Sequence, residues 1–327
     1  MRAANKQRFR ICVTRRLPAE VENHLGELYE VKLNPDDVPL SREALCEALL
    51  QYDALVPTIT DRLDADLIGL AGRRVRLFAN YGAGLDHIDL EAARSSDLMV
   101  TNTPGALTEA TAEMAILLML MAARRAGEGE RELRAGEWTG WRPTHLVGQS
   151  LAGRTLGLIG FGRIAQRTAE MGRGLGMRII YFSRNPAPPE IEARLDAKRA
   201  LSLEDLAVQS DLVSLHVPGG PATRHLVDNR FLARMKPTSI LINTARGSVV
   251  DEEALAQALT AGRIAAAGLD VYEREPQVHP QLLASDRAVL LPHLGSATIE
   301  SRVAMGMQVA ANLAAYFDGQ PPPDRVA

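Results

Sequence analysis

Cysteine is almost absent from the 327-residue sequence, which contains only Cys12 and Cys46. There is no C-x-x-C pair and no cluster of cysteine with histidine, so the sequence supports neither a disulfide scaffold nor a thiolate zinc site. We therefore expect no metal centre and a reducing, cytoplasmic location. A chain of this length buries a large core without such cross-links, and at about 150 residues per domain it predicts two domains.

An excess of positive charge is also missing. The formal net charge is −3, so nothing predicts binding to nucleic acid or to an anionic membrane. Residues 1–10 are polar and basic without an apolar segment, which predicts no signal peptide. The longest apolar run, 114–123, is too short to span a bilayer. Because it is apolar on all sides, it predicts a helix buried in a core or a subunit interface.

Short apolar runs typical of strands alternate with capped helical segments along the whole chain. This alternation predicts an α/β fold with parallel sheets. The predicted strands are 10–14, 54–59, 76–80, 98–102, 155–159, 178–182, 212–217, 239–243, 265–269 and 289–291. The predicted helices include 42–50, 65–71, 108–125 and 298–316, with a further helix that begins after Asp251.

A glycine-rich turn follows the predicted strand 155–159 and opens a helix. Gly160 permits the tight turn, Gly162 lets the backbone approach a pyrophosphate, and Ala165 lets the helix pack closely on the strand. The N–H groups and the positive dipole end of that helix would face the phosphates. Such a turn also occurs as a plain strand–helix connection, but its position within a βαβ unit favours a dinucleotide site.

The end of the next predicted strand bears on which dinucleotide is bound. An NAD-preferring site usually places an acid about 20 residues beyond the glycine-rich turn, against the ribose 2′-hydroxyl. Here Ser183 stands near that position, followed by Arg184 and Asn185. A hydroxyl with a guanidinium suits a 2′-phosphate, because arginine donates paired, charge-assisted hydrogen bonds. We favour NADP(H), with NAD(H) as the alternative; a plain solvated turn would also explain these residues.

Three polar residues stand near the ends of predicted strands in the second half of the chain, namely Arg246, Glu275 and His293. Ligands of open α/β sheets bind beyond the carboxyl ends of the strands, so the three residues could converge on one site. A protonated His can donate a proton to a ketone oxygen during hydride transfer, and a hydrogen-bonded Glu stabilises and orients that His. An Arg can hold the carboxylate of a 2-oxo acid. Each residue alone also fits a structural role, as a turn histidine, a loop acid or a capping cation.

Five motifs together resemble the D-2-hydroxyacid dehydrogenase family, in its glyoxylate/hydroxypyruvate reductase branch. Besides the glycine-rich turn, they are NYGAGLDHID at 80–89, NTARG at 243–247, GLDVYEREP at 268–276 and PHLGSAT at 292–298. They occur in the order that the family shows.

The resemblance implies two Rossmann-like domains with parallel sheets, of which the substrate domain is discontinuous. Residues 1–102 with 293–327 would form the substrate-binding domain, and 103–292 the dinucleotide-binding domain. Hinges are expected at 104–105 and 292–295. The resemblance also implies a homodimer that pairs through the helix near 108–125. An arm between the subunits would carry Trp138, Trp141 and His145.

The resemblance assigns roles to single residues. The positions matched to catalysis are Arg246, Glu275 and His293, and those matched to the substrate are Ala83, Gly84, Arg246 and Ser296. The positions matched to the cofactor are Thr111, Gly160, Phe161, Gly162, Arg163, Ile164, Ser183, Arg184, Asn185, His216, Val217, Pro218, Thr223, Thr244, Ala245, Arg246, Asp270, His293 and Gly295. Among them, Asp270 matches the acid that holds the nicotinamide carboxamide, and His216 is interpreted as a strand-end residue without a catalytic role.

The resemblance therefore implies an NAD(P)H-dependent reductase of small 2-oxo acids such as glyoxylate and hydroxypyruvate. His293, supported by Glu275, would donate the proton, while Arg246 would hold the acid. The nearest alternative enzyme is a phosphoglycerate dehydrogenase, and a formate- or phosphite-oxidising enzyme is a further one. An alternative of another class is a dinucleotide-sensing binding protein, similar to the corepressors that resemble this family.

Overall fold

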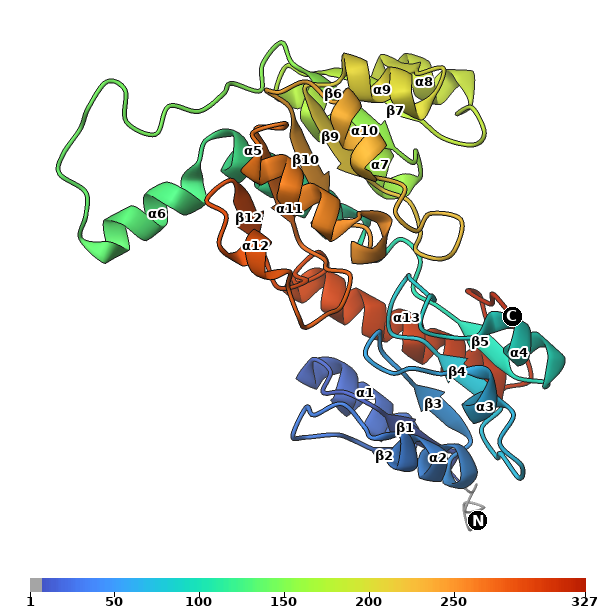
Figure 1. Cartoon of the computed structure of the whole chain (residues 1–327). Coiled ribbons are helices and arrows are strands. Elements are labelled where there is room, and N and C mark those ends of the chain that lie inside the picture. Colours follow the sequence, from blue (N-terminus) through green and yellow to red (C-terminus); the bar gives the residue numbers. More distant parts are fainter. Residues whose placement is uncertain (1–7) are drawn as a thin grey trace, which may run out of the picture. The chain divides into compact units, whose positions relative to one another are not determined.

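The chain folds into two units in the computed structural model, which describes residues 8–327 (Figure 1). Unit 1 comprises Met1–Leu107 and Ser296–Ala327, and unit 2 comprises Thr108–Gly295. The predicted boundaries, after residues 102 and 292, fall a few residues earlier than these. His293 therefore belongs to unit 2 and not with the last helix. Most of the N-terminal stretch that argues against a signal peptide, residues 1–7, lies outside the described residues.

Unit 1 is built on a five-stranded parallel sheet with the order β2-β1-β3-β4-β5. Its strands are β1 (Arg10–Val13), β2 (Glu30–Lys32), β3 (Ala54–Val56), β4 (Leu77–Ala79) and β5 (Met99–Thr101). Its helices are α1 (Ala19–Leu28), α2 (Arg42–Gln51), α3 (Ala65–Ile68), α4 (Leu90–Ser95) and α13 (Ile299–Phe317).

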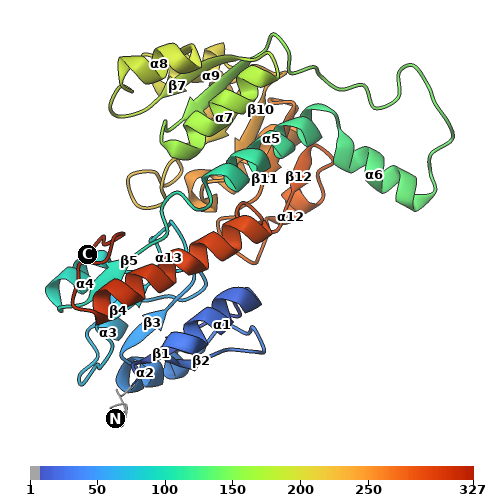
Figure 2. The same cartoon turned by 180° about the vertical axis from the view of Figure 1, so that it is seen from behind.

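Successive strand residues of unit 1 point to opposite faces of the sheet and so feed two separate cores. Ile11 and Val56 pack with α1 and α13, whereas Cys12 and Leu55 pack with α2, α3 and α4. Figure 2 shows α1 and α13 side by side on their face of the sheet. Helices on both faces explain why the strands inside the sheet, such as β3 and β4, are apolar on both faces, whereas the edge strand β2 carries charged side chains.

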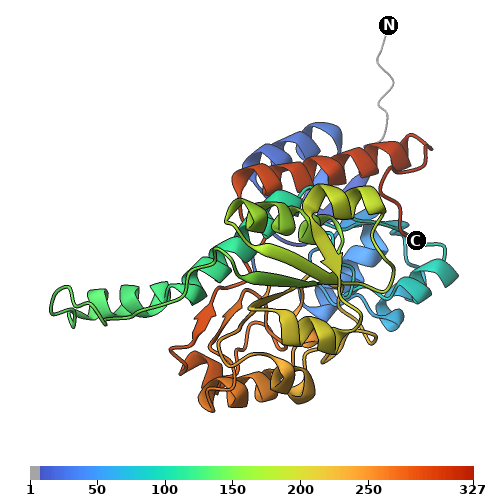
Figure 3. The ribbon, with the colours of Figure 1, turned by 90° about the horizontal axis from the view of Figure 1, so that it is seen from above.

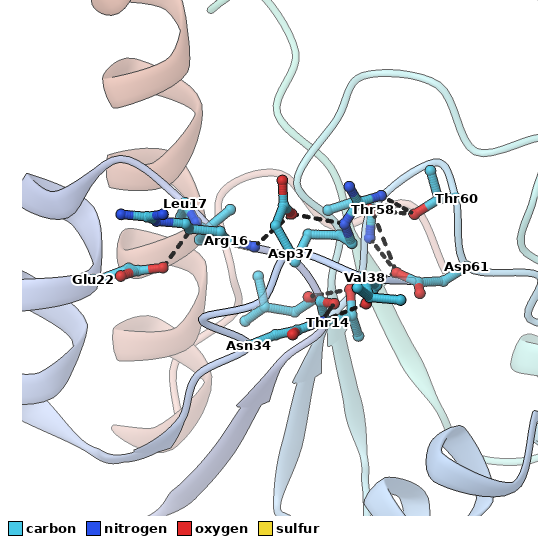
Figure 4. Close-up of polar contacts among 12 residues, drawn as sticks. Thr14, Arg16, Leu17, Glu22, Asn34, Asp37, Val38, Thr58, Thr60 and Asp61 are labelled. Carbon is cyan, nitrogen blue, oxygen red and sulfur yellow. Dashed lines mark hydrogen bonds and ion pairs between the residues drawn. The ribbon is translucent and has the colours of Figure 1, made fainter. Parts of the chain in front are cut away.

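The loops at the carboxyl edge of the unit 1 sheet are joined by a cluster of polar contacts (Figure 4). The Thr14 hydroxyl and the Thr58 N–H, which follow β1 and β3, both donate to the buried carboxylate of Asp61. Arg15 donates to Asp37 at 2.8 Å, which links the loop after β1 to the loop after β2. Burial raises the pKa of Asp61 in spite of its hydrogen bonds. These contacts fix the three loops relative to one another.

Unit 2 is built on a seven-stranded parallel sheet with the order β12-β11-β10-β9-β6-β7-β8. Its strands are β6 (Thr155–Ile159), β7 (Arg178–Phe182), β8 (Ala197–Arg199), β9 (Leu212–Leu215), β10 (Ile240–Asn243), β11 (Ala266–Leu269) and β12 (Ala288–Leu290). The strand order reverses between β6 and β9, and ligands of open α/β sheets bind at such a point, beyond the carboxyl ends of the strands.

Helices cover both faces of the unit 2 sheet. One face is covered by α5 (Thr108–Ala123), α7 (Arg163–Gly174) and α8 (Pro189–Leu195). The other is covered by α9 (Leu203–Gln209), α10 (Asn229–Arg234), α11 (Glu252–Thr260) and α12 (Pro280–Leu283). A short 3-10 turn, η1 (Gly247–Val249), precedes α11.

The apolar run 114–123 lies within α5 and is only partly buried. Ala115, Leu118 and Met119 are buried, while Leu117 and Leu120 are 44% and 38% exposed. After α5, the helix α6 (Ala126–Ala135) extends away from the sheet of unit 2 and buries none of its residues (Figure 3). No helix within residues 8–327 combines the length and the apolarity that crossing a membrane requires.

The predicted strands agree best with the observed ones where the observed strand is long and buried. The predictions 155–159 and 178–182 coincide with β6 and β7. The prediction 54–59 is too long, because β3 ends at Val56 before Pro57. The strands β2 and β8 were not predicted, because each has three residues, stands at a sheet edge and carries charged side chains.

The buried acid Asp211 supplies a testable contribution to the stability of unit 2. Its carboxylate accepts hydrogen bonds from the Thr155 N–H and from Lys236 Nζ, both at 2.9 Å. Burial alone would raise the pKa of Asp211, but these hydrogen bonds and the charges of Lys236 and Arg154 outweigh it and lower that pKa. A carboxyl whose pKa is lower in the folded chain stabilises the fold above its unfolded pKa and loses that effect as the pH falls.

We expect Asp211→Asn to lower the free energy of unfolding by about 1–3 kcal/mol near neutral pH. The difference from the wild type should shrink as the pH falls below about 4, the ordinary pKa of the unfolded carboxyl, and should vanish once the carboxyl is also protonated in the folded chain. Urea unfolding at several pH values measures this. The exposed Asp66→Asn is the control and should change stability by less than about 0.5 kcal/mol. An Asp211→Asn effect of equal size at neutral and acid pH would contradict the assignment.

Candidate active site

The glycine-rich turn after β6 is fixed to the end of β7. Gly160 has a φ of 86°, and a Cβ there would lie 2.4 Å from the His216 carbonyl oxygen, so this position requires glycine. The Gly160 N–H donates to the Phe182 carbonyl at 2.8 Å. The ring of Phe161 stacks on that of Tyr181 in β7, with 3.9 Å between centroids. These contacts therefore hold the glycine-rich turn against the end of β7, at the carboxyl edge of the unit 2 sheet.

Gly162 is a glycine for a different reason. Its φ is −76°, which any residue adopts, and a Cβ at this position would have no atom within 4 Å. It is the N-cap of α7, whose first turn starts with Arg163 and Ile164 and contains no acid and no side-chain cap. Free N–H groups and a positive dipole end favour an anion, and the open space lets one approach. The turn thus fits the pyrophosphate of a dinucleotide.

The residues predicted to read the ribose lie in the turn after β7. The Ser183 hydroxyl donates to the Asn185 carbonyl. The Arg184 side chain is exposed and makes no hydrogen bond or ion pair with any residue of 8–327. Arg199, at the end of β8, donates from Nη2 to the carbonyl oxygens of Ser183 at 2.9 Å and Arg184 at 3.3 Å. No sequence motif pointed to Arg199, because the short edge strand β8 has no strand pattern.

The loop after β9 adjoins the same edge. The His216 N–H donates to the Ile159 carbonyl at 2.7 Å, and its Nε2 lies 2.9 Å from the Ser214 hydroxyl. Burial lowers the pKa of His216 to about 3, so its ring is neutral near neutral pH and unsuited to acid–base work. The Thr223 hydroxyl donates to the Pro218 carbonyl at 2.6 Å and so shapes the loop that starts at Val217.

The turn after β10 is organised by Asn243. Its Nδ2 donates to the Arg246 carbonyl at 2.9 Å, and its Oδ1 accepts from the Ala245 N–H at 3.0 Å. Between them, Thr244 has a buried hydroxyl oxygen without a hydrogen-bond partner among the described residues. An orphaned buried hydroxyl fits a position that a ligand contacts. Asn243 belongs to the motif at 243–247, but its role in shaping this turn was not predicted.

Glu275 and His293 are hydrogen-bonded to each other, as the sequence predicts. His293 Nδ1 lies 2.7 Å from Glu275 Oε2, and Glu275 Oε1 accepts from the Tyr272 N–H at 3.0 Å. Their side chains are 31% and 35% exposed, so both are accessible. Burial alone would raise the pKa of Glu275, but the hydrogen bond and charge of His293, the Tyr272 N–H and the charge of Arg246 lower it below its usual value. Glu275 is therefore a carboxylate at neutral pH.

Arg246 lies near this pair. Its charge contributes to the lowered pKa of Glu275, and its Nη1 donates to the Ala245 carbonyl at 2.7 Å. The next residue, Gly247, packs directly on the peptide after Tyr272, since a Cβ at Gly247 would lie 1.8 Å from the Tyr272 carbonyl carbon. The absence of a side chain at Gly247 thus allows the Arg246 turn to approach the Glu275 turn. The structure brings the three predicted catalytic residues together in unit 2.

Asp270 holds the loop that carries His293. Its carboxylate accepts from the N–H groups of Leu294 and Gly295, both at 2.7 Å, and its carbonyl accepts from the His293 N–H at 2.9 Å. The Thr111 hydroxyl donates to the Gly295 carbonyl at 3.0 Å. Burial raises the pKa of Asp270 in spite of its hydrogen bonds. Asp270 and Thr111 are predicted to contact the cofactor, but their hydrogen bonds to the loop of His293 were not predicted.

The residues predicted to bind the substrate are divided between the two units. Ala83, Gly84 and Ser296 belong to unit 1, and Arg246 belongs to unit 2. Asn80 Nδ2 donates to the Gly84 carbonyl at 3.0 Å, and Asn102 Nδ2 donates to the Ala83 carbonyl at 2.9 Å. The carbonyl groups of this loop are therefore engaged by asparagine side chains of unit 1. No group of three or more His, Cys, Asp or Glu side chains in the described part of the chain is arranged to hold a metal ion.

Comparison with known proteins agrees with this geometry. Residues 116–295 match the model of the NAD-binding domain of D-isomer-specific 2-hydroxyacid dehydrogenases. The chain is 46% identical over 326 residues to a glyoxylate reductase of Aeropyrum pernix, covering 98% of this chain and 96% of the relative. It is 44% identical over 321 residues to a glyoxylate reductase of Thermococcus onnurineus, covering 97% of this chain and 95% of the relative.

A solved structure shows the same likeness. The NADPH-dependent glyoxylate/hydroxypyruvate reductase of Sinorhizobium meliloti, in complex with NADP and malonate, superposes with a TM-score of 0.85 at 33% identity, over 98% of this chain and 97% of that one. The predicted family resemblance and the predicted pair of Rossmann-like domains with parallel sheets are confirmed. The chain belongs to the D-isomer-specific 2-hydroxyacid dehydrogenase family and is an NAD(P)-dependent dehydrogenase.

Proposed function

We propose that this protein reduces small 2-oxo acids, glyoxylate and hydroxypyruvate, to the corresponding 2-hydroxy acids with NADPH. The observation that carries the proposal is the 2.7 Å hydrogen bond between His293 and Glu275, with Arg246 close by, in a unit whose glycine-rich turn fits a dinucleotide. Glyoxylate reductases at 42–46% identity support the substrate class.

The proposed mechanism assigns one task to each residue. When bound, the reduced nicotinamide supplies the hydride that the substrate carbonyl carbon accepts. His293 donates the proton from Nε2 to the carbonyl oxygen, because its Nδ1 is engaged by Glu275. Glu275, ionised at neutral pH, stabilises the protonated ring and fixes its orientation. Arg246 is assigned to the substrate carboxylate, and the N–H groups of Ala83 and Gly84, with Ser296, are assigned as the substrate contacts from unit 1.

The proposed cofactor contacts follow the strand ends of unit 2. Gly160, Gly162 and the start of α7 would hold the pyrophosphate, and Ser183 and Arg184 the 2′-phosphate of NADP(H). The loop after β9, the buried Thr244 hydroxyl and Asp270 would line the rest. Support comes from the open side of Gly162, the exposed Arg184 without a carboxylate partner among the described residues, and the orphaned hydroxyl of Thr244.

We further propose a cytoplasmic homodimer that pairs through α5. Leu117 and Leu120 leave part of this apolar helix exposed, and burying such a surface against a second copy is favourable. The arm after α5 would carry Trp138 and Trp141, which are 52% and 83% exposed, onto the other subunit. Both cysteines are free, which agrees with a reducing compartment.

A turnover assay tests the proposal. We expect NADPH oxidation with glyoxylate and hydroxypyruvate, slower turnover with 3-phosphohydroxypyruvate, and a lower kcat/KM with NADH. The variant His293→Ala should lose about 10²–10⁴-fold in kcat, because it removes the proton donor. His24→Ala, on α1, is the control and should retain wild-type activity. Preferred turnover of 3-phosphohydroxypyruvate would favour a phosphoglycerate dehydrogenase, and dinucleotide binding without turnover would favour a sensor.

Replacement of Glu275 tests the acid–base pair. In Glu275→Gln the ring of His293 loses the carboxylate that accepts its Nδ1 hydrogen bond and holds its orientation. We expect kcat for glyoxylate to fall by about tenfold or more with a smaller change in KM, because the proton donor is no longer held in place. Steady-state kinetics with NADPH measure this. A variant with the kcat of the wild type would show that Glu275 does not act through His293.

Gly247 tests the packing that places Arg246 beside Glu275. Gly247→Ala should lower kcat/KM for glyoxylate by more than about tenfold and lower the melting temperature, because the new Cβ collides with the Tyr272 carbonyl and pushes the two turns apart. The control is Gly174→Ala, at the end of α7, where a Cβ would meet no atom within 4 Å. Equal behaviour of the two variants would contradict the assignment.

A further inference from the structure

We propose that Arg199 is a second guanidinium of the 2′-phosphate site, which it forms together with Arg184 and Ser183, and that it helps to decide between NADP and NAD. This inference rests on the proposed function, since it assumes that the turn after β7 meets the adenosine ribose. It adds a specificity-determining residue that comes from the edge strand β8, outside every motif of the sequence.

The register of the sheet places Arg199 at the carboxyl edge. The strands β7 and β8 are parallel, and Tyr181 is paired with Arg199. Both strands therefore end at the same level, and Arg199 is the last residue of its strand. From there its Nη2 reaches the carbonyl oxygens of Ser183 and Arg184, at 2.9 and 3.3 Å. The guanidinium is thus held against the backbone of the turn that carries the two predicted 2′-phosphate residues.

This turn adjoins the expected position of the pyrophosphate. Phe182, the residue before Ser183, accepts a hydrogen bond from the Gly160 N–H at 2.8 Å. Phe161 of the glycine-rich turn stacks on Tyr181, the strand partner of Arg199. A dinucleotide with its pyrophosphate at Gly162 and the start of α7 would extend its adenosine ribose toward the end of β7. Arg199 lies on the outer side of that position, because β8 is the edge strand.

The charge at this turn is not neutralised by the chain. Arg184 and Arg199 are both exposed, and neither forms an ion pair with a carboxylate among residues 8–327. By contrast, Arg194, on the nearby helix α8, approaches Glu170 at 3.8 Å. Two like charges on one turn repel each other, and a phosphate dianion would remove that repulsion while accepting charge-assisted hydrogen bonds. Of the donors of Arg199, only Nη2 is used by the described residues, so Nε and Nη1 remain available.

A purely structural role for Arg199 and a role in binding the 2′-phosphate lead to different expected binding results. If Arg199 only holds the turn through its two carbonyl contacts, its loss should weaken every ligand that lies on the turn. If its charge reads the 2′-phosphate, its loss should weaken only ligands that carry this group. Glutamine separates the two roles, because its amide can still donate to a carbonyl oxygen but has no charge.

The experiment is calorimetric titration of the full-length protein with adenosine 2′,5′-bisphosphate and with adenosine 5′-monophosphate, which differ only in the 2′-phosphate. We expect Arg199→Gln to weaken the bisphosphate by about tenfold, or 1.4 kcal/mol, while the Kd of the monophosphate stays within about twofold. Arg184→Ala should act in the same direction. The matched control is Arg178→Gln, which removes the same charge from the opposite end of β7, where Arg178 bonds Thr155, and should change neither Kd.

The outcomes separate the inference from the function on which it rests. Equal weakening of both ligands in Arg199→Gln, or no weakening of either, overturns the role of Arg199. A wild-type protein that binds the monophosphate as tightly as the bisphosphate overturns the preference for NADP, and the inference with it. In that case Arg184→Ala is also without effect, so the two failures are distinguishable. Selective loss of the bisphosphate alone supports the inference.

Discussion

The hydrogen bond between His293 and Glu275 is the constraint on which the site depends, and most of the polar contacts of unit 2 near it serve to hold its two ends. His293 has a φ of 55°, a left-handed conformation that is unfavourable for a residue with a side chain. Such a conformation persists only where the surroundings fix it. Here the backbone of His293 is bound to Asp270, whose carboxylate also accepts the next two N–H groups. The unfavourable backbone conformation of His293 is thus held by these hydrogen bonds, and in it the imidazole contacts Glu275.

Glu275 and Asp270 are two neighbouring acids whose pKa values are shifted in opposite directions. Each shift has an identifiable physical cause. The pKa of Glu275 is lowered because a histidine, an arginine and a backbone N–H outweigh its burial. The pKa of Asp270 is raised because burial outweighs two backbone N–H groups and the charge of His293. Only Glu275 shares a side-chain hydrogen bond with a titratable partner, and it is also the more exposed of the two. The difference separates the acid that is proposed to support proton transfer from the acid that holds a loop.

The sequence was sufficient to predict turns and strands that depend on residues close together in the chain. It was insufficient to predict contacts between residues that are far apart in the chain. Gly160 and Gly162 could be interpreted from a motif of a few residues, and β6 could be predicted from an unbroken apolar run. The positioning role of Asp270 depends on Leu294 and Gly295, which meet it only in the folded sheet. Arg199 depends on a pairing between β7 and an edge strand whose residues, Ala-Lys-Arg, carry no strand pattern. Tertiary pairing, not local propensity, determines these contacts.

The hinge expected at 292–295 illustrates the same limit. Pro and Gly residues suggest a flexible segment, yet in unit 2 Asp270 binds the N–H of Gly295 and Thr111 binds its carbonyl. On the other side of the boundary, the Ser301 hydroxyl donates to the Ala106 carbonyl at 3.0 Å within unit 1. The chain passes between the units twice, at 107–108 and at 295–296. Within each unit, a hydrogen bond therefore joins the residues that lie close to these two crossings. A hinge at 292–295 would have to break the contacts that aim His293, so any bending that leaves the His293–Glu275 pair intact must fall between Gly295 and Ser301.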